Sequence, residues 1–402
     1  MRTFLLAAAG ALVGAQSAAL AAETALRDAI LLDDSAEAMS LSLSKAAGAE
    51  VSAQLQFRYD INLRDDTSLT LANPDDDTTI GFSVRRARVN VAGQVTDNIK
   101  AKIQMDFNRA TGTATLQEGY ADWTINDGLK LRIGSQKLHF ARENTVGSAK
   151  QLSAEASVFD SVFGSGYAQF VEAWFGGDAW RGWLAFSDGF NSRNTAFTSA
   201  SEADYAITGR AEFKFGDADF KAFDDFTSWR GSAAGGLIGG AFHWQSMGDT
   251  NPSVPAGSTD MLSLTGDFTY EADGWNAHAA VAWRNTDGPA GDYDDWGFLV
   301  QGGIFVTDTT ELFARFDMVS PDDTRAPVTP GSTVDDFSTI TFGVNHYLVP
   351  ESHAAKFTLA VMYYLDEVSN TGGVVGASDG LNLLADTEDG QVGITAQLQL
   401  LF

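Results

Sequence analysis

Residues Gln391–Phe402 have the sequence QVGITAQLQLLF, and this stretch decides the fold. Apolar side chains occupy every second position from Val392 to Phe402, and the intervening positions up to Gln399 are polar or glycine. A period of two predicts a β-strand with one apolar face and one wet face. Because hydrocarbon tolerates no unpaired strand edge, we expect this last strand to close a membrane barrel against the first strand.

The composition agrees with a chain of short strands and turns. Of the 402 residues, 40 are glycine and 8 are proline. No residue is cysteine, which excludes disulfides and thiolate metal sites. Beyond the N-terminus, no segment has the roughly 18 uninterrupted apolar residues that a membrane-spanning helix needs. The formal net charge of −27 argues against nucleic acid as a partner.

The N-terminus differs from the rest of the chain. Residues 1–21 begin with a positive charge, continue with an apolar run and end in small residues, which is the order of a secretory signal peptide. The alternative, a membrane anchor, is disfavoured because the run is short and rich in alanine and glycine. Residues 22–52 are predicted to be a periplasmic N-terminal segment. Within it, Thr24–Met39 either forms a short helix that docks on a partner or plugs the barrel mouth, or is a disordered leader.

For residues 53–402 we predict an all-β fold, a transmembrane antiparallel β-barrel of about 16 strands. An even number of strands is what single-chain outer-membrane barrels have. The predicted strands are 53–61, 80–95, 99–109, 116–125, 129–138, 167–176, 180–187, 204–215, 235–246, 260–271, 275–284, 294–306, 311–318, 337–348, 354–364 and 390–402.

The connections between these strands are sorted by length. Even-numbered strands are followed by short turns rich in Asp, Asn and Gly, such as Asn126-Asp127-Gly128. Odd-numbered strands are followed by long polar loops, at 62–79, 139–166, 188–203, 247–259, 285–293, 319–336 and 365–389. Two connections break the rule, because 110–115 is short and 216–234 is long. The sorting predicts a barrel inserted into a membrane in one direction.

The two faces of the predicted strands differ in polarity. Ile103 and Phe107 lie on one face, and Lys102 lies on the other. In a porin the apolar set faces lipid and the polar set faces a water-filled lumen. Trp275 and Trp283 are expected at the two ends of their strand, where interfacial aromatic residues belong.

Several motifs resemble, in their order, the phosphate-selective porin O/P family of outer-membrane porins. The resemblance covers most of 53–402. It is carried by Arg85–Gly93 (RRARVNVAG), Lys102–Phe107 (KIQMDF), Leu116–Trp123 (LQEGYADW), Leu129–Lys137 (LKLRIGSQK), Trp183–Asn191 (WLAFSDGFN), Phe223–Phe226 (FDDF), Trp229 and the terminal Phe402.

The resemblance implies a sixteen-stranded outer-membrane channel, often a homotrimer, with the long third loop 139–166 folded into the lumen as a constriction. Members named for phosphate select it with rows of arginine and lysine that line the pore. The counterparts in this chain would be Arg86, Arg88, Lys100, Lys102, Lys130 and Arg132 on strands, and Arg142 and Lys150 in the loop.

Acidic residues leave the selectivity open at this stage. The expected constriction loop also holds Glu143, Glu155 and Asp160. One interpretation is a preference for anions or phosphate, since rings of cations lower the barrier for anions. The other is a mixed-charge wall in which the cations face strand acids such as Asp106 and Glu118.

We therefore predict a passive outer-membrane diffusion channel for small hydrophilic solutes, with no cofactor and no metal. Its partners would be outer-membrane lipid and small solutes or anions. The histidines show no metal-ligand spacing and no Gly-x-Ser-x-Gly occurs, so we predict no enzyme. Acidic loop clusters such as Asp75–Asp77 either bind divalent cations or keep the loops solvated. The alternatives are a plugged barrel that acts as a surface binding or adhesion protein, a barrel hydrolase and a soluble secreted β-protein.

Overall fold

The structure is a computed structural model that describes residues 49–64, 78–199, 202–247, 259–327, 333–378, 380–385 and 389–402. Nearly all of them belong to one compact unit, Ser52–Phe402, and the following account concerns this unit. The predicted signal peptide and most of the predicted segment 22–52 lie outside the described residues. Within the described part of the chain, no helix is long and apolar enough to cross a membrane.

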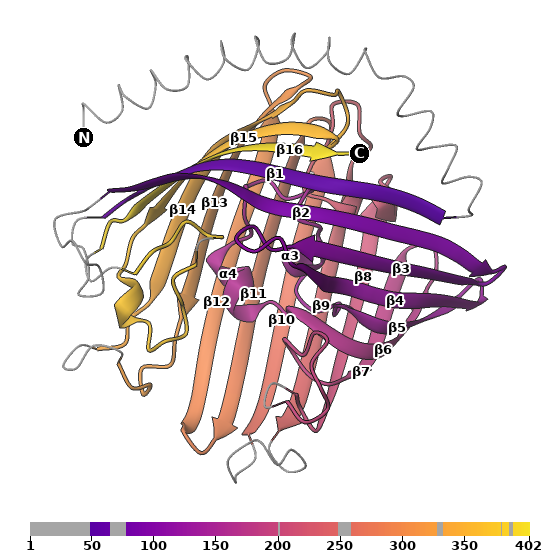
Figure 1. Cartoon of the computed structure of the whole chain (residues 1–402), viewed down its shortest axis with the longest axis horizontal. Helices are drawn as coiled ribbons and strands as arrows, with labels where there is room; N and C mark the ends of the chain where they lie inside the picture. Colours follow the sequence, from indigo (N-terminus) through magenta and orange to yellow (C-terminus); the bar gives the residue numbers. More distant parts are fainter. Residues whose placement is uncertain are drawn as a thin grey trace. The chain divides into compact units, whose positions relative to one another are not determined.

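The described residues form sixteen strands in one closed antiparallel barrel, in which each strand pairs with its neighbours in sequence and the last closes on the first (Figure 1). The strands are β1 (Ala49–Leu63), β2 (Thr78–Thr96), β3 (Ile99–Phe107), β4 (Ala114–Asn126), β5 (Leu129–Lys137), β6 (Tyr167–Gly176), β7 (Trp180–Ser187), β8 (Tyr205–Gly216), β9 (Gly235–Met247), β10 (Thr259–Ala272), β11 (Trp275–Gly288), β12 (Gly291–Phe305), β13 (Thr310–Ser320), β14 (Phe337–Tyr347), β15 (Ala355–Tyr364) and β16 (Val392–Leu401). Each strand overlaps one of the predicted strands, so the predicted fold class is confirmed.

The closure of the barrel follows the prediction made from the last strand. β16 pairs antiparallel with β1, from Gln54 opposite Leu401 to Leu63 opposite Val392. On the lumen side of this seam, the side chain of Gln56 donates to Oε1 of Gln399 at 2.8 Å. The polar face of the last strand is therefore used for hydrogen bonds within the lumen, and its apolar face is left for lipid.

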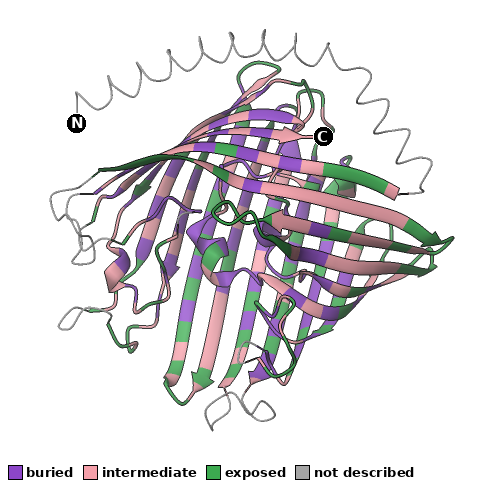
Figure 2. Ribbon diagram, in the orientation of Figure 1, coloured by how far each residue is buried: buried purple, intermediate pink, exposed green. Residues whose placement is uncertain are grey.

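The alternation of side chains along the strands also follows the prediction. Ile103 and Phe107 are exposed on the outer face, at 47% and 37% of their accessible surface. Lys102 instead makes an ion pair with Glu118 at 2.8 Å inside the barrel. Figure 2 shows the resulting bands of buried and exposed residues along the strands. The apolar set faces lipid, as a membrane barrel requires.

The predicted loop 285–293 is wrong, because β11 and β12 continue as a hairpin to Gly288 and Gly291. Polar side chains hold these outer rungs together. Asn285 donates to Asp292 at 2.8 Å, and the indole of Trp283 donates to Asp294 at 3.0 Å. Trp283 therefore lies five residues before the end of its strand. Polar composition alone could not distinguish these water-exposed rungs from a loop.

Loop 138–166, which joins β5 to β6, folds into the lumen and carries two short helices, α3 (Arg142–Thr145) and α4 (Val158–Phe163). Helix α4 packs on β12 and β13, where Gly297 leaves space for the ring of Phe163. The Asp317 carboxylate accepts hydrogen bonds from the backbone N–H of Val158 at 2.8 Å and of Phe159 at 3.3 Å. The far end of the loop is thus fixed to the wall opposite its origin.

Segment 217–234, which joins β8 to β9 and contains the 3₁₀ helix η1 (Phe220–Asp224), explains the one long connection on the turn side. Phe226 of this segment is fully buried and packs with Val146 and Leu152 of loop 138–166. Its backbone N–H donates to the carbonyl of Lys150 at 3.3 Å. The long turn therefore folds inward and contacts loop 138–166 from the short-turn side of the barrel.

Candidate permeation site

Loop 138–166 crosses the lumen because side chains of the far wall bind its backbone. Lys356 of β15 donates to the carbonyl of Gln151 at 2.8 Å, and Asn345 of β14 donates to that of Leu152 at 2.9 Å. Arg315 of β13 donates to the carbonyl of Glu155 at 3.0 Å. These bonds attach residues 151–155 of the loop to the wall formed by β13, β14 and β15.

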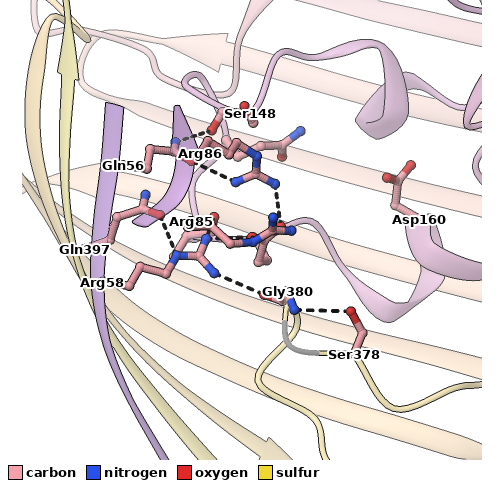
Figure 3. Close-up of polar contacts among 12 residues, drawn as sticks. Gln56, Arg58, Arg85, Arg86, Ser148, Asp160, Ser378, Gly380 and Gln397 are labelled. Atoms are coloured by element: carbon pink, nitrogen blue, oxygen red, sulfur yellow. Dashed lines mark hydrogen bonds and ion pairs between the residues drawn. The ribbon is translucent and has the colours of Figure 1, made fainter. Parts of the chain in front are cut away.

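Arg58 of β1 and Arg85 and Arg86 of β2 lie close together in the lumen (Figure 3). All three form ion pairs with the carboxylate of Glu155 in loop 138–166. Arg58 lies 2.7 Å from Oε1 of Glu155, Arg85 lies 2.6 Å from the same oxygen, and Arg86 lies 2.8 Å from Oε2. The side chains of Arg58 and Arg86 are at most 9% exposed, whereas that of Arg85 is 29% exposed. We call Arg58, Arg85 and Arg86 the arginine triad.

The arginine triad is bound unequally by the rest of the lumen. Arg58 also donates to Oε1 of Gln397 at 2.7 Å and to the carbonyl of Ala154 at 2.7 Å. Arg86 donates through Nη1 to Gln56 at 2.8 Å, but its buried Nε has no hydrogen-bond partner among the described residues. The triad therefore holds more N–H donors than its surroundings accept.

The triad decides the protonation of the loop carboxylate. Burial alone would raise the pKa of Glu155, but the positive charges of Arg86, Arg58 and Arg85 outweigh burial and hold its pKa well below the usual range. Glu155 is therefore an anion throughout the pH range of growth. It offsets one of the three positive charges, so the described side chains of the site keep a cationic excess.

Two cavities meet at the triad. A cavity of about 210 Å³ lies between Arg85 and Arg86 and the loop, and Asp160 faces it from α4 (Figure 3). A larger cavity of about 690 Å³ also borders Arg85 and Arg86 and continues among residues near the long-loop end of β3 and β4. Within the described part of the chain, its charged lining residues are five arginines and one carboxylate: Arg85, Arg86, Arg88, Arg109, Arg193 and Asp106.

The wall formed by β3, β4, β5 and β6 is also rich in cations, but acids and aromatic rings cover them. Asp122 binds Arg132 at 2.6 Å and Lys130 at 3.5 Å. Lys130 lies 3.2 Å above the ring of Trp174, and Arg132 lies 4.0 Å from the ring of Tyr120. Such cation–π contacts attract the cations to the wall without removing their charge. We call this region the paired wall, and include Lys102 with Glu118 in it.

The comparisons with known proteins agree with this geometry. The family model described as phosphate-selective porin O and P matches residues 54–375. The chain belongs to this porin family. No curated protein sequence matches the chain.

Solved structures of porins share the fold. An anion-selective porin from Comamonas acidovorans is 12% identical, with a TM-score of 0.57 and coverage of 88% of this chain and 99% of that one. OmpT of Vibrio cholerae, folded in vitro, is 15% identical, with a TM-score of 0.56 and coverage of 88% and 97%. The channel DcaP of Acinetobacter baumannii is 13% identical, with a TM-score of 0.54 and coverage of 88% and 98%. Together, family and fold make this protein an outer-membrane diffusion channel of a Gram-negative bacterium.

In this porin, the eight cations predicted from the sequence lie in four different environments. Arg86 and Arg88 border the 690 Å³ cavity, where Arg88 also binds Asp106 at 3.0 Å. Lys102, Lys130 and Arg132 belong to the paired wall. Lys100 is exposed near the short-turn end of β3.

The two predicted loop cations bind the porin's inward turn instead of the arginine triad. Arg142 is 3% exposed and donates to the carbonyls of Phe223 and Asp225. Lys150 makes a long ion pair with Asp225, at 3.8 Å. Arg86 and Arg88 thus contact loop 138–166 at Glu155 and Ser148. Arg142 and Lys150 belong to this loop but contact segment 217–234.

The sequence reasoning missed Arg58 and Arg85. Val84 is exposed on the outer face of β2, yet Arg85 and Arg86 both reach Glu155 in the lumen. The alternation therefore changes phase at this point, as it does at a β-bulge. A strict period of two, counted from the lumen residues Arg86 and Arg88, assigns Arg85 to the lipid face. Arg58 follows Gln54 and Gln56 at every second position, and this polar row was a usable signal for the lumen.

Proposed function

We propose that this porin prefers anions and that the arginines at the constriction set the preference. The observation that carries the proposal is the 690 Å³ cavity, whose charged lining among the described residues consists of five arginines and one carboxylate. Clustered positive charge in a narrow, partly desolvated passage lowers the free energy of an anion and raises that of a cation. The net charge of the chain, −27, does not determine the local field at this point.

The position of the arginines supports the same proposal. Arg85 and Arg86 border both cavities, so a solute that moves from one cavity to the other passes their guanidinium groups. Arg85 is part-exposed and has one described hydrogen-bond acceptor, Glu155. Guanidinium groups bind the oxygens of carboxylates and phosphates in bidentate geometry, so small oxyanions are the solutes that this passage fits best. Inorganic phosphate is one such oxyanion.

The test is the reversal potential of the purified porin in planar bilayers under a KCl gradient. We expect the sign that corresponds to chloride permeation. Neutralisation of two cavity arginines, Arg86→Gln with Arg88→Gln, should lower the chloride-to-potassium permeability ratio by about 30-fold, since each charge contributes about 1 kcal/mol even in a water-like dielectric.

The control is the matched pair Lys130→Gln with Arg132→Gln, which removes the same charge from the paired wall. Because Asp122 offsets one of these two charges and the rings of Trp174 and Tyr120 lie against both cations, we expect a smaller change. A wild-type porin that prefers potassium, or equal effects of the two pairs, would exclude the proposal.

We further propose passive diffusion without catalysis, and a homotrimer, which the family resemblance implies. Strands β3, β5 and β7 have 9, 9 and 8 residues, whereas β11 and β12 have 14 and 15, so the wall is lowest on one side of the barrel. A low wall suits contact with other copies. Light scattering of the detergent-solubilised porin gives the number of copies, and a monomer would contradict the trimer.

A further inference from the structure

Glu155 occupies the place in the arginine triad that an anion from solution would take. Its two carboxylate oxygens accept from three guanidinium groups, at 2.7, 2.6 and 2.8 Å. This is the coordination that a carboxylate or phosphate solute would receive from the same side chains. The difference is that this carboxylate is attached to the constriction loop.

Donors remain for a second anion even with Glu155 bound. The buried Nε of Arg86, in a residue that is 8% exposed, has no partner among the described residues. Arg85 binds Glu155 through Nε and borders both cavities. An anion that enters from either cavity therefore meets donors that are already shared with Glu155.

The position of the loop does not depend on the Glu155 side chain. Arg315 holds the backbone carbonyl of Glu155 at 3.0 Å, and Arg58 holds that of Ala154 at 2.7 Å. Lys356 binds the carbonyl of Gln151 further along the loop. A neutral side chain at position 155 should therefore leave the loop in place and leave three guanidinium groups, two of them buried, without their anion. An uncompensated buried charge is costly, and an anion from solution would remove that cost.

We propose that Glu155 is a tethered competitor for the oxyanion site of the arginine triad. Each permeating oxyanion has to share or displace this carboxylate, so it binds weakly and leaves quickly. The site then passes anions without retaining them, as conduction requires. The inference rests on the proposed anion preference, and it assigns to Glu155 the role of setting affinity at that site.

The test uses inorganic phosphate as a blocker of the chloride current through the full-length porin in planar bilayers. Glu155→Gln keeps the shape of the side chain and removes its charge. We expect the phosphate concentration that halves the current to fall by about tenfold or more, because hydrogen bonds to charged groups contribute about 1.5–3 kcal/mol. An unchanged half-blocking concentration would overturn the proposal.

The control is Glu118→Gln, which removes a lumen carboxylate whose side chain is also 11% exposed but whose partner is Lys102 of the paired wall. It changes the lumen charge equally, and its half-blocking concentration should stay within about twofold of wild type, because the triad keeps its own carboxylate. Equal sensitisation by E118Q and E155Q would mean that general lumen charge, and not competition at the triad, controls block, and would overturn the proposal.

Glu155→Asp serves if E155Q does not fold. It keeps the charge but withdraws the carboxylate by one methylene, so block should strengthen by a few-fold; block equal to wild type would refute competition. The reversal potential of wild-type porin separates the two proposals. If wild type prefers potassium while E155Q becomes phosphate-sensitive, the proposed function fails and the role of Glu155 stands. If wild type prefers chloride and E155Q is unchanged, only the role of Glu155 fails.

Discussion

The constriction and the paired wall of this porin differ in how they neutralise their cations. At the constriction, Arg58, Arg85 and Arg86 share one carboxylate. In the paired wall, Lys102 has Glu118, while Lys130 and Arg132 share Asp122 and two aromatic rings. A count of lumen arginines and lysines would rate the two regions alike. Among the described residues, the constriction has one carboxylate for three cations, whereas the paired wall has two carboxylates for three cations. The constriction therefore keeps the larger cationic excess, so equal charges in one lumen should have unequal consequences.

The largest expected effect concerns stability and lies in the part of the lumen where charges are fully paired. Arg210 of β8 is 4% exposed and binds Asp267 through two bonds, at 2.8 and 2.9 Å, and Glu212 at 2.8 Å. Arg210→Ala should lower the free energy of unfolding by about 3–5 kcal/mol, because it leaves the buried carboxylate of Asp267 without its ion-pair partner and leaves Glu212 with Arg181 alone.

The matched variant at the constriction is Arg85→Ala, which should lower the free energy of unfolding by no more than about 1 kcal/mol, since Arg85 is part-exposed and Glu155 keeps two other arginines. Urea unfolding of both variants in lipid vesicles measures the difference. In bilayers the order should reverse, with R85A changing ion preference more than R210A does. Equal losses of stability would show that the two regions do not differ.

A second prediction concerns the loop that creates the constriction. Burial raises the pKa of Glu143 in α3 to about 7, the carboxylate of Asp160 adds to the shift, and Arg315 and Ser157 oppose it. The folded porin thus holds a proton that the unfolded chain releases above its ordinary pKa of 4.5. Ionisation of Glu143 therefore lowers the free energy of unfolding: this loss is absent below pH 4.5 and complete above about pH 7.

The loop should therefore be more stable at pH 5 than at pH 8, by up to a few kcal/mol at about 1.4 kcal/mol per pKa unit. Burial also raises the pKa of Asp160, which contributes in the same direction. Glu155, whose pKa the triad lowers, stays charged over this window and adds no pH dependence. Hydrogen exchange of backbone amides in 138–166 at the two pH values measures the effect, and Glu143→Gln should flatten it. An equally steep response in E143Q would assign it to other groups.

A third, smaller effect compares two single carboxylates. Asp106→Asn frees Arg88 at the 690 Å³ cavity, and Asp122→Asn frees Lys130 and Arg132 in the paired wall. Both should raise the chloride-to-potassium permeability ratio. We expect about fivefold for D106N, corresponding to about 1 kcal/mol. D122N should give about twofold, since the two rings still screen its cations. A larger effect of D122N would make the paired wall the selective region.

The fold could be predicted from the sequence because a membrane barrel repeats one pattern along every strand. The period of two and the sorting of connections gave all sixteen strands in the described residues. The error at 285–293 arose because the outer rungs of β11 and β12 lie beyond the apolar band and are polar on both faces. Hydrophobic periodicity disappears where water replaces lipid on the outer face.

The site was less accessible from the sequence. The family resemblance implied Arg86 and Arg88 as pore-lining residues, but alternation counted from them misses Arg85, because a local change of phase turns two consecutive arginines inward. The contacts of Arg142 and Lys150 depend on the inward fold of 217–234, which is far away in sequence. The register of the barrel and the path of the loops decide which carboxylate each cation contacts. Neither can be recognised from a local sequence pattern.

The smallest expected effect tests the same comparison at a third place, Lys100. This side chain is exposed near the short-turn end of β3, and it makes no ion pair with described residues. Two residues further on, Lys102 points into the barrel and binds Glu118 at 2.8 Å. Water and salt screen an exposed charge within about 10 Å, so Lys100→Gln should change the permeability ratio by less than about 20%. A positive charge in this lumen acts on permeating ions only where protein excludes water and no acid faces it. A shift in K100Q as large as that of the R86Q/R88Q pair would move the selective region from the constriction to the short-turn mouth.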